Sequence, residues 1–362
     1  MISVSPSAKQ NLGEMVQALL DWYRENARSL PWRENTDPYR IWISEIMLQQ
    51  TRVEAVKPYY QRFLARLPNI FALAEIHEDE LFKLWEGLGY YSRARNLQKA
   101  ARMICERFGG CFPQHYEDIL SLPGVGPYTA GAIASIAFGQ PTPAVDGNVM
   151  RVLARVTETR QSIADPQLKK EFTERLREIY PPHHCGDFTQ SLMELGAIIC
   201  LPNGAPLCAA CPLCGLCRAF AHSVQNELPV LPRAKQRKKQ NITVFLLTCG
   251  ENVAVHKRES KGLLAGLWEF PNCEEKLTEA KAMQWLSARG LAPEKLISAP
   301  EKKHIFTHVE WTMCCFLAEC QKPGGEFKWV SRDALISELS LPTAFRQFLP
   351  FLFRSPAHND KE

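Results

Sequence analysis

The hydrophobic pattern of the chain changes near residue 220, and this change divides the fold into at least two parts. Before it, apolar residues recur at helical spacing, as in QNLGEMVQALLDWYREN, without convincing strand-like alternation. After it, ITVFLLTC, NVAVHKRE and WTMCCFLAEC are β-branched or aromatic runs bounded by turn residues, which is typical of strands. The sequence therefore predicts an all-α domain followed by an α+β domain.

Length and composition agree with a two-domain protein that does not enter a membrane. At 362 residues the chain exceeds one ordinary core, and its 46% apolar and 23% charged residues are typical of globular proteins. There is no run of about 18 apolar residues and no apolar signal-peptide core, so we expect no membrane contact and a cytoplasmic location. The net charge of +4 permits a nucleic-acid partner without requiring one.

Composition also suggests where the segments begin and end. We predict a helical region over residues 1–225, a basic linker over 226–240, an α+β domain over 241–355 and a tail over 356–362. The linker carries two prolines and then five basic residues in the stretch PVLPRAKQRKK. It fits a solvated spacer, and contact with DNA phosphates is the alternative.

Five of the thirteen cysteines lie between residues 200 and 217. In a chain without an export signal this clustering indicates metal binding rather than disulfides, and free buried cysteines fit the Pro- and Gly-rich loop poorly. Zn²⁺ sites usually show two separated cysteine pairs, whereas this loop has one close pair flanked by two single cysteines, which favours an iron–sulfur cluster. The candidate ligands are separated by gaps of seven, two and five residues, with Cys214 as a fifth cysteine: Cys200, Cys208, Cys211 and Cys217.

The stretch SLPGVGPYTAG predicts a tight turn before a buried helix. Gly124 and Gly126 expose backbone N–H groups next to a helix N-terminus, an arrangement that suits a DNA phosphate, although an ordinary interhelical turn is the alternative. Asp146 in PAVDGNVMRVLAR stands at the start of a further helix. It serves there as an N-cap or as a fixed anion that stabilises a cationic transition state.

A second carboxyl group lies in an apolar stretch. Glu45 in WISEIMLQQ either faces solvent or lies against an apolar wall. An apolar wall raises the pKa of a carboxyl group and makes it a usable general acid.

These motifs together resemble a known family. LPGVG, then VDG, then the cysteine cluster resemble the helix-hairpin-helix DNA glycosylases of the endonuclease III superfamily. WISEIMLQQTRVEAV, GLGYYSRARNLQKAA, GVGPYTAGAI and AVDGNVMRVLAR resemble the MutY-type adenine DNA glycosylases, over about residues 15–350. The first cysteine gap of seven departs from the commoner family spacing of six. The resemblance implies an all-α glycosylase core with a [4Fe-4S] cluster loop and a C-terminal α+β Nudix-like domain.

The resemblance also implies catalytic roles. Glu45 matches the acid that protonates adenine at N7, and Asp146 matches the carboxylate that stabilises the oxocarbenium-like sugar or bonds briefly to C1′. Asn148 and Tyr128 match residues that line the same pocket. Endonuclease III-like lyases carry a lysine where this chain has Tyr128, and a phenol cannot form an imine. This residue and the second domain disfavour the alternative, a bifunctional thymine-damage glycosylase and lyase.

Further positions match residues that contact DNA or the flipped base. Gly124 and Gly126 match the phosphate-binding hairpin. Trp32 has plain core packing as an alternative. The remaining matches are residues that probe or fill the base stack, namely Gln50, Thr51 and Tyr90, and residues that line the adenine pocket, namely Arg28, Trp32, Arg33 and Gln190.

The C-terminal motifs KGLLAGLWEFP and HIFTHVEW resemble the Nudix-like domain that reads 8-oxoguanine. The family's Phe-Ser-His turn matches Phe306, Thr307 and His308, and a structural role is the alternative for His308. A pyrophosphatase, the rival function for this domain, needs clustered glutamates for Mg²⁺, but Glu274 and Glu275 lack the Arg-Glu…Glu-Glu pattern.

The sequence thus predicts a monofunctional adenine DNA glycosylase of base excision repair. We expect a monomer that acts at the bacterial nucleoid on double-stranded DNA with 8-oxoguanine·A or G·A mispairs. A cluster-bearing DNA-binding protein without activity is the alternative, and it leaves the positions of Glu45 and Asp146 unexplained.

Overall fold

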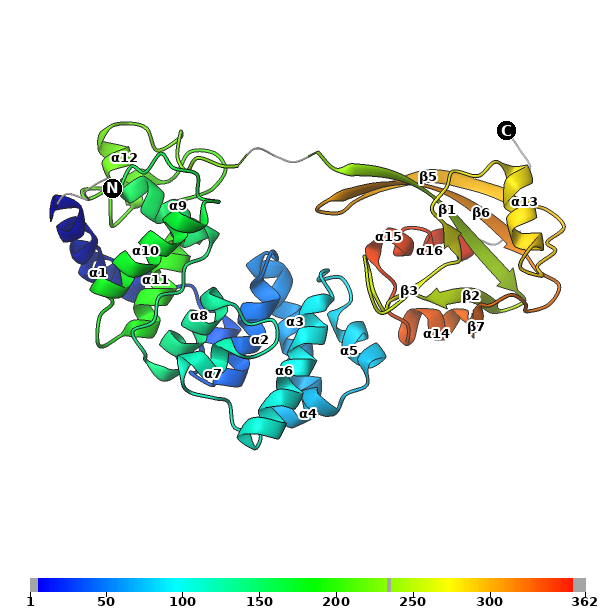
Figure 1. Cartoon of the computed structure of the whole chain (residues 1–362), viewed down its shortest axis with the longest axis horizontal. Helices are drawn as coiled ribbons and strands as arrows, with labels where there is room; N and C mark the ends of the chain where they lie inside the picture. Colours follow the sequence, from blue (N-terminus) through cyan, green and yellow to red (C-terminus); the bar gives the residue numbers. More distant parts are fainter. Residues whose placement is uncertain (1–5, 233–235, 354–362) are drawn as a thin grey trace. The chain divides into compact units, whose positions relative to one another are not determined.

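The computed structural model describes residues 6–232 and 236–353, which form two compact units (Figure 1). The helical unit contains residues 6–75 and 95–232, and the sheet unit contains residues 76–94 and 236–353. Helices thus precede strands in the predicted order, but residues 76–94 group with the sheet unit although they lie within the predicted helical region. The predicted tail, and Arg233 and Lys235 of the predicted linker, lie outside the described residues.

The helices of the helical unit begin at the expected signals. Asp37 and Asp165 cap two helices by accepting hydrogen bonds from backbone N–H groups, and proline follows each cap. The elements are α1 (Pro6–Asn26), η1 (Pro31–Arg33), α2 (Pro38–Leu48), α3 (Val53–Arg66), α4 (Ile70–Glu75), α6 (Ser92–Phe108, which starts in the sheet unit), α7 (Tyr116–Leu120), α8 (Pro127–Phe138), α9 (Gly147–Val156), α10 (Pro166–Ile179), α11 (Cys185–Ile198), η2 (Cys208–Ala210) and α12 (Arg218–Ala221).

Glycine is required at one position in the turn between α7 and α8 and at another within α8. Gly124 has φ of +78°, and a Cβ there would lie 2.7 Å from Cβ of Asn96. Further along α8, a Cβ on Gly131 would lie 2.2 Å from the carbonyl oxygen of Pro143. Small residues therefore let α8 approach the segment that leads into Asp146, and residues 129–135 of α8 are all buried, as the apolar composition predicts.

The core of the helical unit lies where α9 is enclosed by other helices. Side chains of α1, α9, α10 and α11 form one buried cluster, which includes Val149, Phe172 and Phe188. Helix α11 also packs against α8, and α8 packs against α2. The helices that carry Glu45, Tyr128 and Asp146 are thus held against one another through α8 and α11.

The sheet unit contains a seven-stranded mixed sheet with the order β3-β2-β1-β6-β5, in which β4 pairs with β1 and β7 pairs with β2. Strands β1 and β6 run parallel, and the other pairs are antiparallel. The elements are α5 (Glu78–Trp85), β1 (Lys238–Cys249), β2 (Asn252–Lys257), β3 (Trp268–Glu269), β4 (Asn272–Cys273), α13 (Glu279–Ser287), β5 (Ile297–Ile305), β6 (Val309–Glu319), β7 (Lys328–Ser331), α14 (Arg332–Ser337), α15 (Thr343–Arg346) and α16 (Leu349–Leu352).

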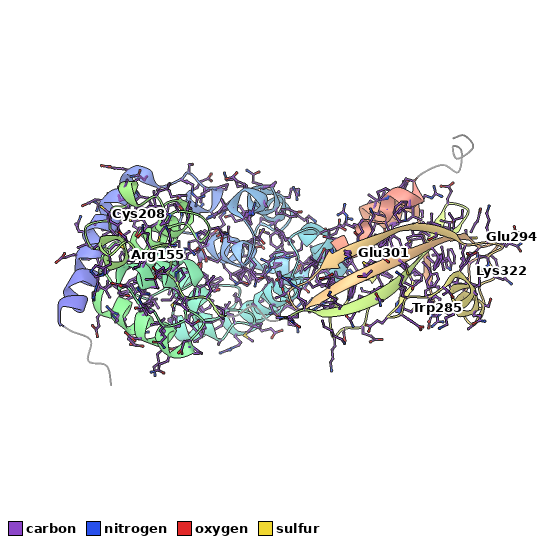
Figure 2. All side chains as sticks on the ribbon, turned by 90° about the horizontal axis from the view of Figure 1, so that it is seen from above. Arg155, Cys208, Trp285, Glu294, Glu301 and Lys322 are labelled. Atoms are coloured by element: carbon purple, nitrogen blue, oxygen red, sulfur yellow. The ribbon has the colours of Figure 1, made fainter. Side chains whose placement is uncertain are left out.

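Both faces of this sheet are covered, which explains the continuous apolar run in β1. Val244 and Leu246 face a cluster with residues of α14, α15 and α16. Phe245 and Leu247 face a second cluster with α13, where the Phe245 ring stacks on Trp285 (labelled in Figure 2) at 4.5 Å between ring centroids. Strand β1 begins at Lys238, inside the predicted linker.

Helix α5 and the loop after it are tied to the C-terminal segment by polar contacts. Lys83 Nζ donates to the carbonyl of Leu339, and Glu86 accepts from the backbone N–H of Leu341 and pairs with Arg346 at 2.8 Å. These contacts explain why residues 76–94 belong to the sheet unit.

In the described part of the chain, every helix falls short of the length and apolarity that crossing a membrane requires.

Gly131→Ala is expected to destabilise the protein. Alanine normally favours a helix over glycine by about 1 kcal/mol, but here the added Cβ meets backbone at 2.2 Å, so we expect a net loss of about 1–3 kcal/mol and a lower Tm. Gly13→Ala in α1, where nothing lies within 4 Å of the added Cβ, is the matched control and should be neutral or slightly stabilising. Thermal unfolding of both variants checks this. Equal Tm values for Gly131→Ala and wild type would contradict the close approach.

Candidate active site

Most of the catalytic and base-contacting residues predicted for the helical region line one cavity. The cavity has a volume of about 770 Å³ and opens between α2, η1, α8, α9 and α11. Gly126 lines it, and nothing lies within 4 Å of a Cβ placed there, so a ligand atom could approach the backbone. The predicted residues that line the cavity are Arg28, Trp32, Arg33, Glu45, Gln50, Thr51, Gly126, Tyr128, Asp146, Asn148 and Gln190.

Glu45 lies on α2 with only 6% of its surface exposed, so the solvent-facing alternative is wrong. The Tyr128 hydroxyl donates a hydrogen bond of 2.8 Å to Oε2 of Glu45. Burial, reinforced by the nearby Asp146 carboxylate, raises the pKa of Glu45 to about 7, although the Tyr128 hydrogen bond and the charge of Arg33 oppose the rise. Glu45 is therefore a carboxyl group that can hold a proton near neutral pH.

Asp146 caps α9 and also lines the cavity, so the cap and the site are one residue. Its Oδ1 accepts from the backbone N–H of Val149 at 2.8 Å, and its Oδ2 accepts from Asn148 Nδ2 at 2.9 Å. Burial raises the pKa of Asp146, while these hydrogen bonds favour the charged form. The helix N-terminus adds a favourable field for the carboxylate.

The residues around Tyr128 and Trp32 determine the protonation of the first and the packing of the second. Tyr128 stands in the first turn of α8, and burial together with Glu45 raises its pKa well above 10, so it remains a phenol. Trp32 is 8% exposed and meets Tyr60 edge-on at 5.5 Å between centroids. It is both a packed residue and a lining residue of the cavity, which combines the two alternatives.

Glu194 on α11 belongs to this site and was missed in the sequence. Its side chain is 1% exposed and lies between Arg28 and Arg33, at 2.6 Å and 2.8 Å respectively. Burial disfavours its charge, but the two guanidinium groups outweigh burial and lower its pKa to about 2. The signal that could have found it is a lone acid in an apolar helix, SLMELGAII, the same pattern that marked Glu45.

Arg151 on α9 was also missed, and it links the site to the cysteine loop. Its Nη2 donates to Oδ1 of Asn148 at 2.9 Å and to the carbonyl of Gly196 at 2.8 Å. Its Nε donates to the carbonyl of Cys200 at 2.9 Å. One buried guanidinium thus connects Asn148, the partner of Asp146, with the first cysteine of the cluster.

The predicted cysteine ligands face a second, smaller cavity in the helical unit. Cys200, Cys208, Cys211 and Cys217 line it together with Cys214, and Arg155 Nη1 donates to Sγ of Cys200 at 3.1 Å (Arg155 and Cys208 are labelled in Figure 2). Among the described residues, no group of three or more His, Cys, Asp or Glu side chains is arranged around a single metal ion.

The sheet unit contains the predicted residues Tyr90, Phe306, Thr307 and His308. The hydroxyl groups of Tyr90 and Thr307 are hydrogen-bonded at 2.6 Å, and Thr307 and His308 are exposed between β5 and β6. Phe306 packs edge-on against Trp311 at 4.8 Å. Tyr90, with φ of +46°, and Gln50, with φ of +58°, both have left-handed backbone, which is uncommon outside glycine and concentrates at functional sites.

The fold and this site define a class of protein. Residues 43–182 match the model of the HhH-GPD superfamily of base excision DNA repair proteins, and residues 243–350 match the NUDIX domain. The chain is similar to a solved thermostable thymine-DNA glycosylase, with a TM-score of 0.54 and 31% identity, over 59% of this chain and 98% of that one. A non-covalent endonuclease III–DNA complex is similar with a TM-score of 0.51 and 25% identity, over 60% of this chain and 98% of that chain.

Relatives of known function narrow the class. The adenine DNA glycosylase of Buchnera aphidicola subsp. Baizongia pistaciae is 36% identical over 81% of this chain and 82% of its own length. The mouse adenine DNA glycosylase is 36% identical over 81% of this chain and 68% of its own length. The human adenine DNA glycosylase is 36% identical over 82% of this chain and 65% of its own length. The chain belongs to the adenine DNA glycosylase family. The predicted family and fold class are confirmed.

Proposed function

We propose that this chain is a monofunctional adenine DNA N-glycosylase that hydrolyses the bond between adenine and C1′ of a flipped-out nucleotide. The observation that supports it most is the pair of carboxyl groups in one cavity, Glu45 and Asp146, of which Asp146 accepts hydrogen bonds from Val149 and Asn148 at a helix N-terminus and Glu45 is buried beside Tyr128. Such a pair divides the work of glycosidic cleavage between an acid and an anion. We infer base excision repair as the process and duplex DNA as the substrate, and we expect the chain to act as a monomer.

The chemistry needs one proton and one counter-charge. Protonated Glu45 gives its proton to adenine at N7, which makes the base a better leaving group. As the bond to C1′ breaks, its electron pair leaves with adenine and positive charge develops on the sugar next to ionised Asp146. The Tyr128 hydroxyl, already 2.8 Å from Glu45, stabilises the carboxylate that Glu45 becomes. Water then adds to C1′ and leaves an abasic site.

Base and lesion recognition use groups in both units. Arg28, Trp32, Arg33 and Gln190 would surround the flipped adenine in the cavity, with Gly124 and Gly126 at the phosphate and Gln50, Thr51 and Tyr90 at the base stack. In the sheet unit, Phe306, Thr307 and His308 would read 8-oxoguanine. Thr307 and Tyr90 already share a hydrogen bond, so the probe of the stack and the reader of the opposite base would act together.

A pyrophosphatase activity of the sheet unit is disfavoured by the state of its acids. Glu274 accepts a hydrogen bond from Gln240, and Glu275 pairs with Lys281 at 3.4 Å. Within residues 6–232 and 236–353, neither belongs to a group of three or more acidic, His or Cys side chains that could hold Mg²⁺.

We infer that Cys200, Cys208, Cys211 and Cys217 hold a [4Fe-4S] cluster. All four thiols line one cavity, and their spacing, with one close pair flanked by two single cysteines, favours a cluster over a zinc ion. When bound, the cluster joins four points of the loop into one rigid unit. Arg151 then connects this loop to Asn148 through the Cys200 carbonyl.

The first experiment replaces the two carboxyl groups. Glu45→Gln removes the acid and Asp146→Asn removes the charge, so each should lower the single-turnover rate of adenine release by about 100-fold or more while DNA binding survives. Duplexes with A opposite 8-oxoguanine, G or C are treated with alkali to reveal abasic sites.

Glu174→Gln and Asp21→Asn, which remove exposed carboxylates paired at 2.5 Å and 2.7 Å with arginines, are the matched controls. Absence of abasic sites from every duplex with the wild-type protein would overturn the proposed function. A near-normal rate for either active-site variant would remove the role given to that residue.

Tyr128→Lys is expected to create a lyase-like side reaction. Its amine would lie near C1′ in a buried site, where loss of water lowers the amine pKa and makes some of it a free nucleophile. The amine would add to C1′ as adenine leaves, and opening of the C1′–O4′ bond with loss of a proton from nitrogen would give an imine that borohydride reduces to a stable adduct. Tyr128→Phe, which has no nucleophile, is the control. Trapping of the wild type as strong as that of Tyr128→Lys would contradict the monofunctional assignment.

Metal analysis tests the cluster. We expect a brown protein with about four iron and four sulfide per chain. Cys217→Ser should lose iron and visible absorbance, whereas Cys214→Ser should keep both because Cys214 is not among the proposed ligands. Finding about one zinc and no iron in the purified protein would contradict the assignment.

A further inference from the structure

We propose that Glu194 is a positioning residue of the excision site, which holds the guanidinium groups of Arg28 and Arg33 and thereby limits the electrostatic influence of Arg33 on Glu45. The proposal rests on the proposed role of Glu45 as the acid. Glu194 acts only through the two arginines.

The contacts of Glu194 use both of its carboxylate oxygens. Oε1 accepts from Arg28 Nε at 2.6 Å and from the backbone N–H of Arg28 at 3.1 Å. Oε2 accepts from Arg28 Nη2 at 2.9 Å and from Arg33 Nη2 at 2.8 Å. Arg33 also donates from Nη1 to the carbonyl of Arg28 at 3.2 Å. One buried carboxylate from α11 therefore fixes two side chains that come from the segment between α1 and α2.

These two arginines are lining residues of the cavity that contains Glu45. A bidentate contact to a buried carboxylate restricts the plane of the Arg28 guanidinium, which a neutral side chain would do less strongly. Arg33 is restrained further by Tyr23 of α1, over whose ring its guanidinium lies at 5.5 Å from the centroid. Both arginines donate hydrogen bonds from their side chains to Glu194, so this carboxylate is their shared partner.

The charges around Glu45 give the direction of the effect. Glu45 is faced by Tyr128 from α8, by Asp146 from the start of α9 and by Arg33 from η1. Glu194 is faced by Arg28 and Arg33, and Glu54 of α3 and Tyr23 of α1 act on Arg28. Arg33 favours the ionised form of Glu45, and the negative charge of Glu194 next to Arg33 weakens that influence.

Removing the charge of Glu194 leaves two neighbouring cations in the cavity without their shared counter-ion. Arg33 then acts on Glu45 at full strength, so the pKa of Glu45 falls and less acid is present at neutral pH. A purely structural role for Glu194 would lower the rate equally at every pH, whereas this role moves the midpoint of the pH profile.

The test compares Glu194→Gln, which keeps the shape of the side chain, with Glu194→Asp, which keeps its charge. Single-turnover adenine release is measured against pH across the range in which Glu45 titrates. We expect the alkaline midpoint of Glu194→Gln to move toward acid by about one pH unit, with about tenfold slower release above neutral pH and nearly equal release at acid pH. Glu194→Asp should restore the midpoint, and the charge control Glu174→Gln should leave it unchanged.

Arg33→Gln supplies a prediction of opposite sign that does not depend on whether Glu194→Gln folds. It removes the guanidinium group that favours the ionised form of Glu45, so the midpoint of the pH profile should move toward alkaline pH. An unmoved midpoint in Arg33→Gln, or a uniform loss of rate in Glu194→Gln without any shift, would overturn the proposal.

The titration of Glu45 is also measured without activity, by the infrared band of its protonated carboxyl group, which Glu45→Gln identifies by its loss. If the wild type releases no adenine, the proposed function fails, but the band still reports whether Glu194→Gln lowers the pKa of Glu45. If adenine is released and the band does not move, only the role of Glu194 fails.

Discussion

Two carboxyl groups line one cavity, and the proposed chemistry needs one of them neutral and the other charged. Glu45 is kept neutral by burial on α2, while Asp146 receives hydrogen bonds from Val149 and Asn148 at the start of α9. An ionised Asp146 also raises the pKa of Glu45. Gly131 lets α8 approach the segment that leads into Asp146, because a Cβ there would lie 2.2 Å from the carbonyl oxygen of Pro143.

Buried arginines connect this pair to the rest of the unit. Arg151 donates hydrogen bonds to Asn148 and to the carbonyls of Gly196 and Cys200. Arg155 donates to Sγ of Cys200 and to the carbonyl of Leu228. A guanidinium has five donors in one plane, so a single side chain can satisfy several carbonyl oxygens from different segments. Two hydrogen-bonded side chains, Arg151 and Asn148, thus connect the Cys200 carbonyl in the cysteine loop to Asp146.

One segment of the chain belongs to the sheet unit although its position in the sequence does not suggest it. Residues 76–94 lie between helices of the glycosylase region, yet Lys83 and Glu86 contact the backbone of Leu339 and Leu341. The same segment contains Tyr90, whose hydroxyl group is hydrogen-bonded to that of Thr307. One short piece of chain thus contacts both the C-terminal segment and the β5–β6 turn.

The sequence alone determined the features that depend on local pattern. The order of helices and strands, the glycine turn before α8, the cap at Asp146 and the cysteine loop follow from spacing, composition and φ requirements that neighbouring residues impose. Tertiary structure decided what depends on partners far apart in the chain. Burial of Glu45 against Tyr128, the clamp of Glu194 on Arg28 and Arg33, and the pairing of Tyr90 with Thr307 join residues separated by 83, 166 and 217 positions. No periodicity encodes such pairs, because they arise only when packed helices or strands bring buried charges and hydroxyl groups within hydrogen-bond distance.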